Sequence, residues 1–516
     1  MKAIFLTPAL MSSVLASAVA VHASVISIDN GRQLFVDDAL IAATNGVVRH
    51  WNEPTKTGYP IIRPTSSGGR RMGGCACAAD GGLWWDPTID RYRLWYEDDW
   101  AGHMRYAESK DGMSWEFPKL DKVPGTSRVF SDSEEKAIGQ LDSWSVYPDY
   151  KAKDPYSTWN MMISTHEDAS RDILLTSKDG RQFAILGCLG RSSDRSTMYF
   201  DSILNHWVFS LRSVIKPIGR ARRFYSQPDF TVAKGEYRYN YSDAPPWEGV
   251  FRHDFGPRGS LYNFIAVPYE SLMLGVMEVL HGSPRDNRDG LESGLPKQTS
   301  LRFAFSRDGH FYAPAPKSAI RPSGWGSGKW DTGYLSALGG ICVIRNEELW
   351  FYYSGVRGDA EKCIAKVGDQ PEKLQGMYYN GAIGAAKLRR DGFAGLVADG
   401  NGEVTTKPVR FSGAHLFVNA ECYYGEVAAE LLDADGRIIK GYSRADCRGI
   451  KYDDTTKREL TFAGGDLSKF SGRDVSFRFV LHCATLYSFW VSPTAHGESL
   501  GYVAAGGSAY SGVRDL

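Results

Sequence analysis

Ser109-Lys-Asp111-Gly112-Met-Ser-Trp115 decides the fold, because its pattern returns along the chain. Ser-x-Asp-Gly recurs at 177–180 and 306–309, each time with an aromatic residue close behind it, and degraded copies stand at 226–230 and 390–393. Asp-Gly between two strands is a strong signal for a hairpin turn. Copies spaced roughly 50 to 80 residues apart indicate one repeated supersecondary unit.

The residues ahead of each copy also repeat. A β-rich segment ends in an acid, a turn follows, and an aromatic strand begins, as in Trp84-Trp85-Asp86-Pro87 followed by Tyr92–Tyr96. Each unit therefore reads as four antiparallel strands with the Asp-Gly turn between the last two. Five such units predict a five-bladed β-propeller within residues 24–400, since blades bury their faces only by stacking around an axis.

The composition and the hydrophobic pattern of the chain change after Gly400. Residues 401–408 are polar, and the segments 416–420, 428–432, 459–462 and 475–480 alternate as half-buried strands do. We expect a β-sandwich over 401–495. The Gly- and Ser-rich end, 496–516, predicts a flexible tail. The expected fold class is all-β, a five-bladed β-propeller followed by a C-terminal β-sandwich.

Charge and composition narrow the function classes. The 516 residues carry 60 basic and 60 acidic side chains, so the formal net charge is zero. A nucleic-acid partner is not expected, because such proteins usually present a basic face. Aromatic residues make up 13% and there are 55 glycines, which favours a turn-rich β protein with stacking surfaces over a helical bundle.

The N-terminus reads as a cleavable signal peptide over 1–23. Lys2 precedes a mostly apolar run, and Val21-His22-Ala23 offers small residues before Ser24. No later segment is long and apolar enough to span a bilayer, so we expect a secreted or periplasmic protein. The eight cysteines suit that compartment. Cys75 and Cys77 stand too close together for an ordinary disulfide, so we expect buried thiols there. Whether two of Cys422, Cys447 and Cys483 form a disulfide is left open.

The strands that line a propeller channel bring side chains from every blade to one mouth. The first strand of each unit closes with an acid, and seven residues before it stand Asp142 in the second unit and Asp194 in the third. The same count reaches Asn263 in the fourth unit and lands beside Asp80 in the first. We expect Asp80, Asp142 and Asp194 to converge at this mouth. The alternative is that they are structural caps.

Polar and aromatic residues at neighbouring strand ends would form the rim of this mouth. Guanidinium groups can clamp hydroxyls or a carboxylate, and aromatic rings can stack on sugars. A solvated surface residue or a salt bridge is the alternative for each one. The substrate-binding residues predicted on this basis are Arg195, Arg212, Arg223, Trp144, Trp100, Asn263, His166 and Glu167.

Glycoside hydrolysis uses two carboxyl groups on opposite sides of a pocket. One protonates the leaving oxygen, and the other attacks the anomeric carbon or activates water. Asp80, Asp142 and Asp194 are therefore the predicted catalytic residues. The chain contains no G-x-S-x-G, H-E-x-x-H or P-loop motif. No metal and no cofactor are predicted.

Several segments resemble bacterial exported proteins labelled glycosyl hydrolase family 32-like. They are Leu34–Ile41, Tyr106–Gly112, Asp194–Thr197, Gly219–Arg223, Tyr269–Gly275, and in the C-terminal part Val418–Ala420, Gly425–Glu426 and Leu486–Phe489. The resemblance covers most of the mature chain. It implies the five-bladed propeller and β-sandwich of glycoside hydrolase families 32, 43 and 68, with activity on glycans.

The resemblance also implies a role for each acid by its position. Asp80 would be the nucleophile or base, Asp142 would stabilise, and Asp194 would donate the proton. The Asn-Asp-Pro-Asn-Gly, Glu-Cys-Pro and Arg-Asp-Pro blocks of family 32 are missing, so fructan specificity does not carry over.

The function expected from the sequence is an exported glycoside hydrolase that acts on a poly- or oligosaccharide. One alternative is a non-catalytic carbohydrate-binding propeller. A sialidase-like hydrolase is another, suggested by the Asp-Gly repeats, although that chemistry needs an arginine triad and a tyrosine nucleophile. A scaffold or adhesion protein is the last. The expected partner is a carbohydrate, with no nucleic acid and no membrane span, and the oligomeric state is left open.

Overall fold

The computed structural model describes residues 25–64, 75–98, 102–165, 171–233, 239–240, 243–251, 253, 255, 259–281, 297–358, 366–367, 370–371 and 379–516. The predicted signal peptide, 1–23, lies outside these residues. Strands dominate the described part, which confirms the all-β class. Its two α-helices are short: α1 (Asp132–Ile138) and α2 (Glu248–Phe251).

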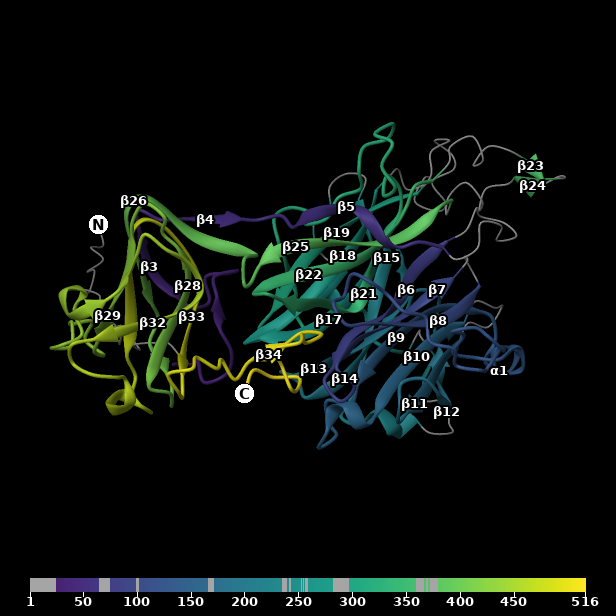
Figure 1. Ribbon diagram of the computed structural model, residues 1–516, viewed down its shortest axis with the longest axis horizontal. Helices are drawn as coiled ribbons and strands as arrows, with labels where there is room; N and C mark the ends of the chain where they lie inside the picture. The colour runs from purple at the N-terminus through teal and green to yellow at the C-terminus, as the bar shows by residue number, and fades with distance from the viewer. Residues whose placement is uncertain are drawn as a thin grey trace, which may run out of the picture.

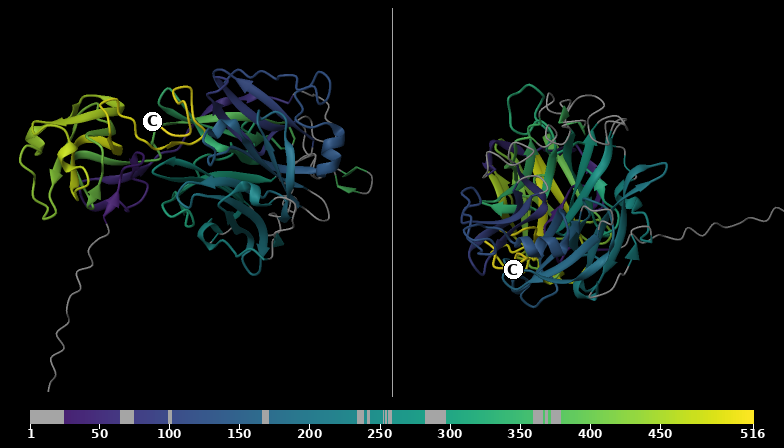
Figure 2. Two further views of the ribbon diagram at one scale, coloured as in Figure 1. Left: turned by 90° about the horizontal axis from the view of Figure 1, so that it is seen from below. Right: turned by 90° about the vertical axis from the view of Figure 1, so that its right-hand side faces the viewer.

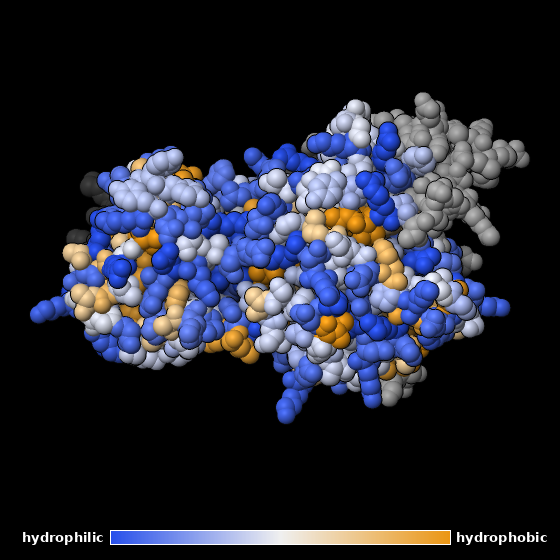
Figure 3. Space-filling view, in the orientation of Figure 1, coloured by the Kyte–Doolittle hydropathy of each residue, from blue (hydrophilic) through white to orange (hydrophobic). Residues whose placement is uncertain are grey.

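The chain forms two parts that lie side by side (Figures 1 and 2). The larger part holds residues from β5 to β25, and the smaller part is built mainly of C-terminal strands. On the face seen in Figure 3, hydrophobic residues form only small separate patches among hydrophilic ones. Most of the apolar side chains are therefore packed inside, in two main clusters that follow the two parts. None of the helices among the described residues is long and apolar enough to cross a membrane.

The first and fifth repeat units share a seven-stranded sheet. Two antiparallel runs meet at its centre, where β21 and β6 are parallel and pair through Leu338 and Asp80. In sheet order the strands are β5 (Thr55–Ile62), β25 (Gly381–Arg389), β22 (Glu348–Val356), β21 (Leu335–Arg345), β6 (Ala76–Asp86), β7 (Arg91–Asp98) and β8 (His103–Ser109).

The middle three repeat units each form a sheet whose main strands are antiparallel and follow chain order, while β16 pairs with β12 in parallel. The second consists of β9 (Leu141–Pro148), β10 (Trp159–Thr165), β11 (Arg171–Ser177) and β12 (Ala184–Arg191), with the short β16 (Tyr239–Asn240) at its edge. The third consists of β13 (Thr197–Asp201), β14 (His206–Ile215) and β15 (Gly219–Gln227). The fourth consists of β17 (Gly259–Glu270), β18 (Leu272–His281), β19 (Gln298–Ser306) and β20 (Ala313–Pro314). Five antiparallel runs thus correspond to the five repeat units.

The Ser-x-Asp-Gly turns are held by their own side chains. The Asp111 carboxylate accepts hydrogen bonds from the amides of Met113 and Ser114, at 2.7 and 2.8 Å. Asp179 and Asp308 accept the same pair of bonds in their own turns. Each turn is therefore stabilised locally, by an aspartate that accepts hydrogen bonds from the amides two and three residues ahead.

Buried aromatic side chains join consecutive sheets of the larger part. The rings of Trp95 on β7 and Trp159 on β10 lie 5.0 Å apart, and Trp84 on β6 meets Tyr147 on β9 at 4.8 Å. Tyr147 in turn contacts Trp207 on β14. Rings of this size bury much apolar area, so they stabilise the contact between one sheet and the next.

The smaller part is one network of ten strands around β33 (Ser476–Ser492). Its division into the two layers of a sandwich stays a prediction. The other strands are β26 (Ala394–Thr406), β28 (His415–Glu421), β29 (Glu426–Leu432), β30 (Cys447–Arg448), β31 (Ile450–Lys451), β32 (Asp454–Phe462), β2 (Gln33–Leu34), β3 (Ile41–Asn45) and β4 (Val48–Trp51); a parallel pair, β1 (Ile26–Ser27) and β27 (Val409–Arg410), adjoins them.

The N-terminal segment differs from the expected boundary at residue 24. Strands β3 and β4 pair with β26, and β2 pairs with β33, so residues 26–51 belong to the C-terminal sheet and not to the repeat region. The physical reason is burial, because Ile28, Phe35 and Leu40 complete the apolar core of the smaller part.

The C-terminal end is ordered structure and not the flexible tail expected over 496–516. Strand β34 (Tyr502–Val503) pairs with β17. Beyond it, the carbonyl of Ala505 accepts a bond from the Trp85 amide, and that of Gly506 from the Ile344 amide, both at 2.8 Å. The small residues that suggested a loose tail are what allow the chain to lie against the inner strands β6 and β21.

Among the described residues, Cys422, Cys447 and Cys483 form no disulfide with one another. The open possibility of a disulfide among those three is therefore not realised. Cys75 and Cys77 are buried, as expected.

Candidate active site

Irregularities in the pairing of β6, β17 and β21 lie at the candidate site. The pairing register shifts in β6 between Cys77 and Gly82, in β17 between Leu261 and Asn263, and in β21 between positions 337 and 342. Ala79 and Asp80 also have positive φ angles, 45° and 62°, which non-glycine residues seldom adopt. Bulges re-aim side chains, and strain of this kind gathers at functional sites.

The Asp80 carboxyl lies at the centre of the cluster and is fully buried. Its Oδ1 accepts hydrogen bonds from the Asn263 side-chain amide and pairs with the Arg195 guanidinium, both at 2.8 Å. Oδ2 is buried as well but has no hydrogen-bond partner among the described residues. Buried polar atoms are rarely left unpaired, so this oxygen calls for an explanation.

Burial raises the pKa of Asp80 to about 8. The positive charge of Arg195 opposes this shift, and the negative charge of Glu278 adds to it. A carboxyl with that pKa is mostly protonated at neutral pH. Asp80 can then hold a proton that an ordinary aspartate has lost.

Arg195 organises the groups around Asp80. Its Nη2 contacts the Glu278 carboxylate at 3.1 Å and the Ser336 hydroxyl at 2.7 Å, and its backbone amide donates to Asp142 at 3.0 Å. Arg195 itself has a φ of 61°. One strained residue thus links the acids of the first, second and fourth units.

Two further groups fix this arrangement. Glu278 accepts hydrogen bonds from the Ser336 hydroxyl at 2.8 Å and the Ala337 amide at 3.0 Å. Arg222, also fully buried, donates to the carbonyl of Arg195 at 2.9 Å and so supports its unusual backbone. Both are positioning residues by these contacts.

Two half-buried carboxylates contact Arg195 or stand beside it in the chain. Asp142 receives the Arg195 amide, as described, and Asp194 forms an ion pair with Arg212 and accepts a bond from Ser193 at 3.0 Å. The structure therefore brings Asp80, Asp142 and Asn263 into one connected cluster, with Asp194 next to it in the chain.

The other residues predicted for substrate binding lie elsewhere or outside the described residues. Arg223 donates to Ser213 and to the carbonyl of Ala244. Trp144 is fully buried in β9, a position that does not favour the predicted stacking on a sugar. The predictions for Trp100, His166 and Glu167 fall on residues outside the described part of the chain.

The sequence reasoning missed Glu278, Ser336 and the supporting role of Arg222. Glu278 had a usable signal, since it is the one acid within the otherwise apolar run Leu272–Leu280. A charge in such a strand is buried and must be paired. Ser336 carried no comparable signal.

The described residues contain no group of three or more His, Cys, Asp and Glu side chains placed to hold a metal ion. The carboxylates of the cluster are instead met by guanidinium, amide and hydroxyl groups. As it stands, the cluster can hold and move a proton and can bind hydroxyl groups.

Comparison with known proteins gives only weak structural similarities. No protein-family model matches the sequence, and no curated protein matches it. Among solved structures, a glycosyl hydrolase from Bacteroides ovatus is 11% identical with a TM-score of 0.42, over 66% of this chain and 93% of that one. An N-acetylgalactosamine deacetylase from F. plautii is 12% identical with a TM-score of 0.43, over 68% and 97%.

A mannose phosphorylase from Leishmania mexicana is 9% identical with a TM-score of 0.41, over 66% of this chain and 89% of that one. Similarities at this level assign neither a family nor an activity to this chain. Its function has to be argued from its own residues.

Proposed function

We propose that the protein is an exported glycoside hydrolase, in which the five antiparallel runs form a five-bladed propeller with the Asp80 cluster at one mouth. The smaller part would be its β-sandwich. The observation that carries the proposal is the Asp80 carboxyl, which is buried and has one oxygen without a partner among the described residues. Export rests on the signal-peptide pattern of residues 1–23.

The chemistry follows from the two kinds of carboxyl in the cluster. A neutral Asp80 would donate its proton to the leaving glycosidic oxygen, while Asp142 would act as the nucleophile or the base. These roles differ from those implied by the family resemblance, in which Asp80 was the nucleophile or base and Asp194 was the proton donor. The raised pKa of Asp80 and the ion pair of Asp194 with Arg212 favour Asp80 over Asp194 as the proton donor.

Non-catalytic carbohydrate binding is a second candidate function. The observation that favours it is the complete burial of Asp80 together with its ion pair to Arg195, which suits a structural carboxyl. The half-buried Asp142, Asp194 and Arg212 would then bind sugar hydroxyls without a reaction.

An activity screen with Asp80→Asn tests the two candidates. The mature protein and the variant would be assayed on aryl glycosides and polysaccharides, with the exposed turn variant Asp435→Asn as the control. We expect Asp80→Asn to lower kcat by at least about 100-fold, since it removes the proton donor. Thermal unfolding would establish that the variant is folded.

Hydrolysis by a folded Asp80→Asn at the wild-type rate would contradict the assignment. Sugar release by the wild type that Asp142→Asn also abolishes would support the carboxyl pair. If the wild type releases no sugar but is retained by glycans on an array, the binding function is favoured.

A further inference from the structure

Three exposed tyrosines gather at one end of the smaller part. The exposed fractions are 53% for Tyr423, 87% for Tyr424 and 75% for Tyr452. Among the described residues, the one other tyrosine with comparable exposure is Tyr59. Exposed large aromatic rings that cluster in this way mark binding surfaces more often than chance placement.

Backbone pairing brings the tyrosines together from two separate loops. Strands β29 and β31 pair Glu426 with Lys451, immediately beside the loops. The Tyr452 amide then donates to the carbonyl of Gly425 at 3.1 Å, and the Cys422 amide donates to Asp453 at 2.8 Å. The loops 422–425 and 452–453 therefore form one surface, which we call the tyrosine platform.

The platform is held in place although its rings are exposed. The Tyr423 hydroxyl donates to the Asp454 carboxylate at 2.9 Å, and Asp454 forms an ion pair with Arg389. Tyr452 has a φ of 53°, an uncommon backbone conformation for a bulky residue. Such strain persists only where the surrounding structure imposes it, and it is often found at binding sites.

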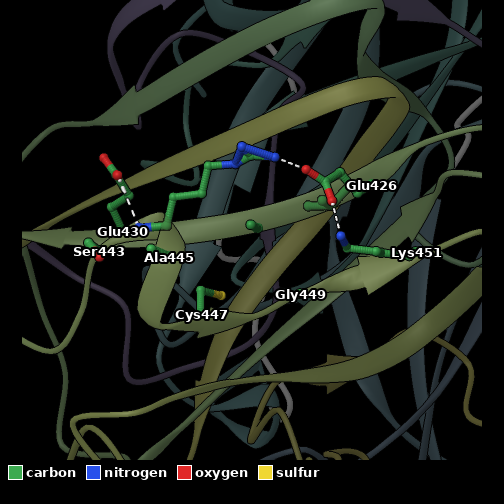
Figure 4. A pocket seen from close by; sticks show the side chains of 10 residues that line it. Glu426, Glu430, Ser443, Ala445, Cys447, Gly449 and Lys451 are labelled. Atoms are coloured by element: carbon green, nitrogen blue, oxygen red, sulfur yellow. Dashed lines mark hydrogen bonds and ion pairs between the residues drawn. The ribbon is translucent and has the colours of Figure 1, made fainter.

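A polar cavity lies along the same strand pair (Figure 4). Its lining residues Glu426 and Lys451 directly follow and precede the two loops of the platform. Its volume is about 570 Å³, and Glu426 and Lys451 form an ion pair across it at 2.8 Å. Glu430, Ser443, Arg444 and Cys447 also line it. Positively and negatively charged side chains, which can donate and accept hydrogen bonds, thus lie next to exposed aromatic rings.

We propose that the tyrosine platform and this cavity form a carbohydrate-binding site separate from the Asp80 cluster. Sugar rings would stack on the tyrosines, and their hydroxyls would bond to the Glu426 and Lys451 side chains. A tyrosine has few rotatable bonds, so little conformational entropy is lost when a ligand covers it. The mixed charges favour a glycan over a lipid surface, which would need a broad apolar face.

The site lies on strands of the smaller part, whereas Asp80 lies on β6 of the larger part. Arg389 connects the platform to the larger part, because it belongs to β25 and forms an ion pair with Asp454, the partner of Tyr423. A polymer bound to the platform would be kept at a fixed position relative to the larger part. The inference goes beyond the proposed hydrolase and does not depend on it.

Affinity electrophoresis tests the site with named probes: gels that contain mannan, xylan, arabinan, mixed-linkage β-glucan or pectin. We expect at least one of these polymers to slow the wild type. Replacement of the three tyrosines by Ala should weaken that affinity about tenfold or more, which is about 1.4 kcal/mol. The control is Tyr59→Ala, which removes an exposed tyrosine elsewhere and should leave the retardation unchanged.

Unaltered retardation of a folded triple variant, or no retardation of the wild type by any of the five polymers, would overturn the proposal. It would also fall if the triple variant changed the sedimentation coefficient and not the glycan affinity, because the platform would then join two copies of the chain.

The test is independent of catalysis. Asp80→Asn should keep the retardation, and the triple tyrosine variant should keep its rate on small aryl glycosides while losing rate on the polymer. If the wild type hydrolyses none of the substrates, the proposed hydrolase fails and the retardation still decides the binding site.

Discussion

At the scale of single residues, Asp80 is the group whose protonation differs most plainly between the folded and the unfolded chain. Burial raises its pKa to about 8 from an ordinary value of 3.8. Between those two values the folded protein keeps a proton that the unfolded chain has released. Stability must therefore fall as pH rises through this window, because the native state binds more protons.

We expect the free energy of unfolding of the wild type to decrease from pH 5 to pH 8 relative to that of Asp80→Asn, which cannot lose a proton. Urea unfolding at both pH values measures the difference. Asp435→Asn, an exposed turn variant, should follow the wild type. Parallel pH profiles for the wild type and Asp80→Asn would show that the Asp80 carboxyl is ionised in the folded protein.

At the scale of elements, the C-terminal segment packs against the inner strands so closely that only glycine fits at one point. A Cβ atom at Gly507 would lie 2.0 Å from the carbonyl oxygen of Ile344 on β21. At Gly512, five residues further on, a Cβ would meet nothing within 4 Å. The two glycines make a matched pair for testing whether this segment is structural.

Gly507→Val should lower the free energy of unfolding by about 2 kcal/mol or more, because overpacking forces backbone shifts. Gly512→Val should stay within about 0.5 kcal/mol of the wild type, as surface substitutions usually do. Thermal and denaturant unfolding provide the measurement. Equal stability of the two variants would mean that the segment from Tyr502 onward is not packed on β21 in solution.

The elements also show what the sequence could and could not predict. The Asp111 turn and its copies were predictable, because an aspartate bonds amides two and three residues away. The seven-residue count reached Asp142 and Asn263 and landed beside Asp80, and hydrogen bonds link Asn263 to Asp80 and the Arg195 amide to Asp142. That these carboxylates are catalytic stays a prediction. Glu278 and the C-terminal strand β34 could not be found in this way, since neither stands at the repeated seven-residue spacing.

At the scale of the whole molecule, a buried ionic network joins the two parts. Arg32, from the N-terminal segment, pairs with Asp391 at 3.2 Å, and Arg390 pairs with Glu270 at 2.5 Å. Ser488, on β33, also donates to Asp391 at 2.6 Å. Each charge in this network is balanced by a partner from another segment, so removal of one partner would leave a buried charge uncompensated.

Loss of one partner should therefore uncouple the two parts. We expect Arg32→Gln to lower the free energy of unfolding by about 3 to 5 kcal/mol, the usual cost of breaking a buried pair. In calorimetry, the single transition of the wild type should divide into two. Arg410→Gln, which breaks an exposed ion pair with Asp474, is the control and should change little. One unchanged transition for Arg32→Gln would contradict the coupling.

The pairing of β5 with β25 has a consequence for how the protein is made. Lys56 on β5 lies opposite Ala386 on β25, and Ala43 on β3 lies opposite Thr405 on β26. More than three hundred residues separate each pair in the chain. At about 5 to 20 residues per second, a ribosome needs roughly 20 to 70 s to deliver the missing strand. For that time the first strands of the protein wait without partners, so the earliest residues to be synthesised are among the last to fold.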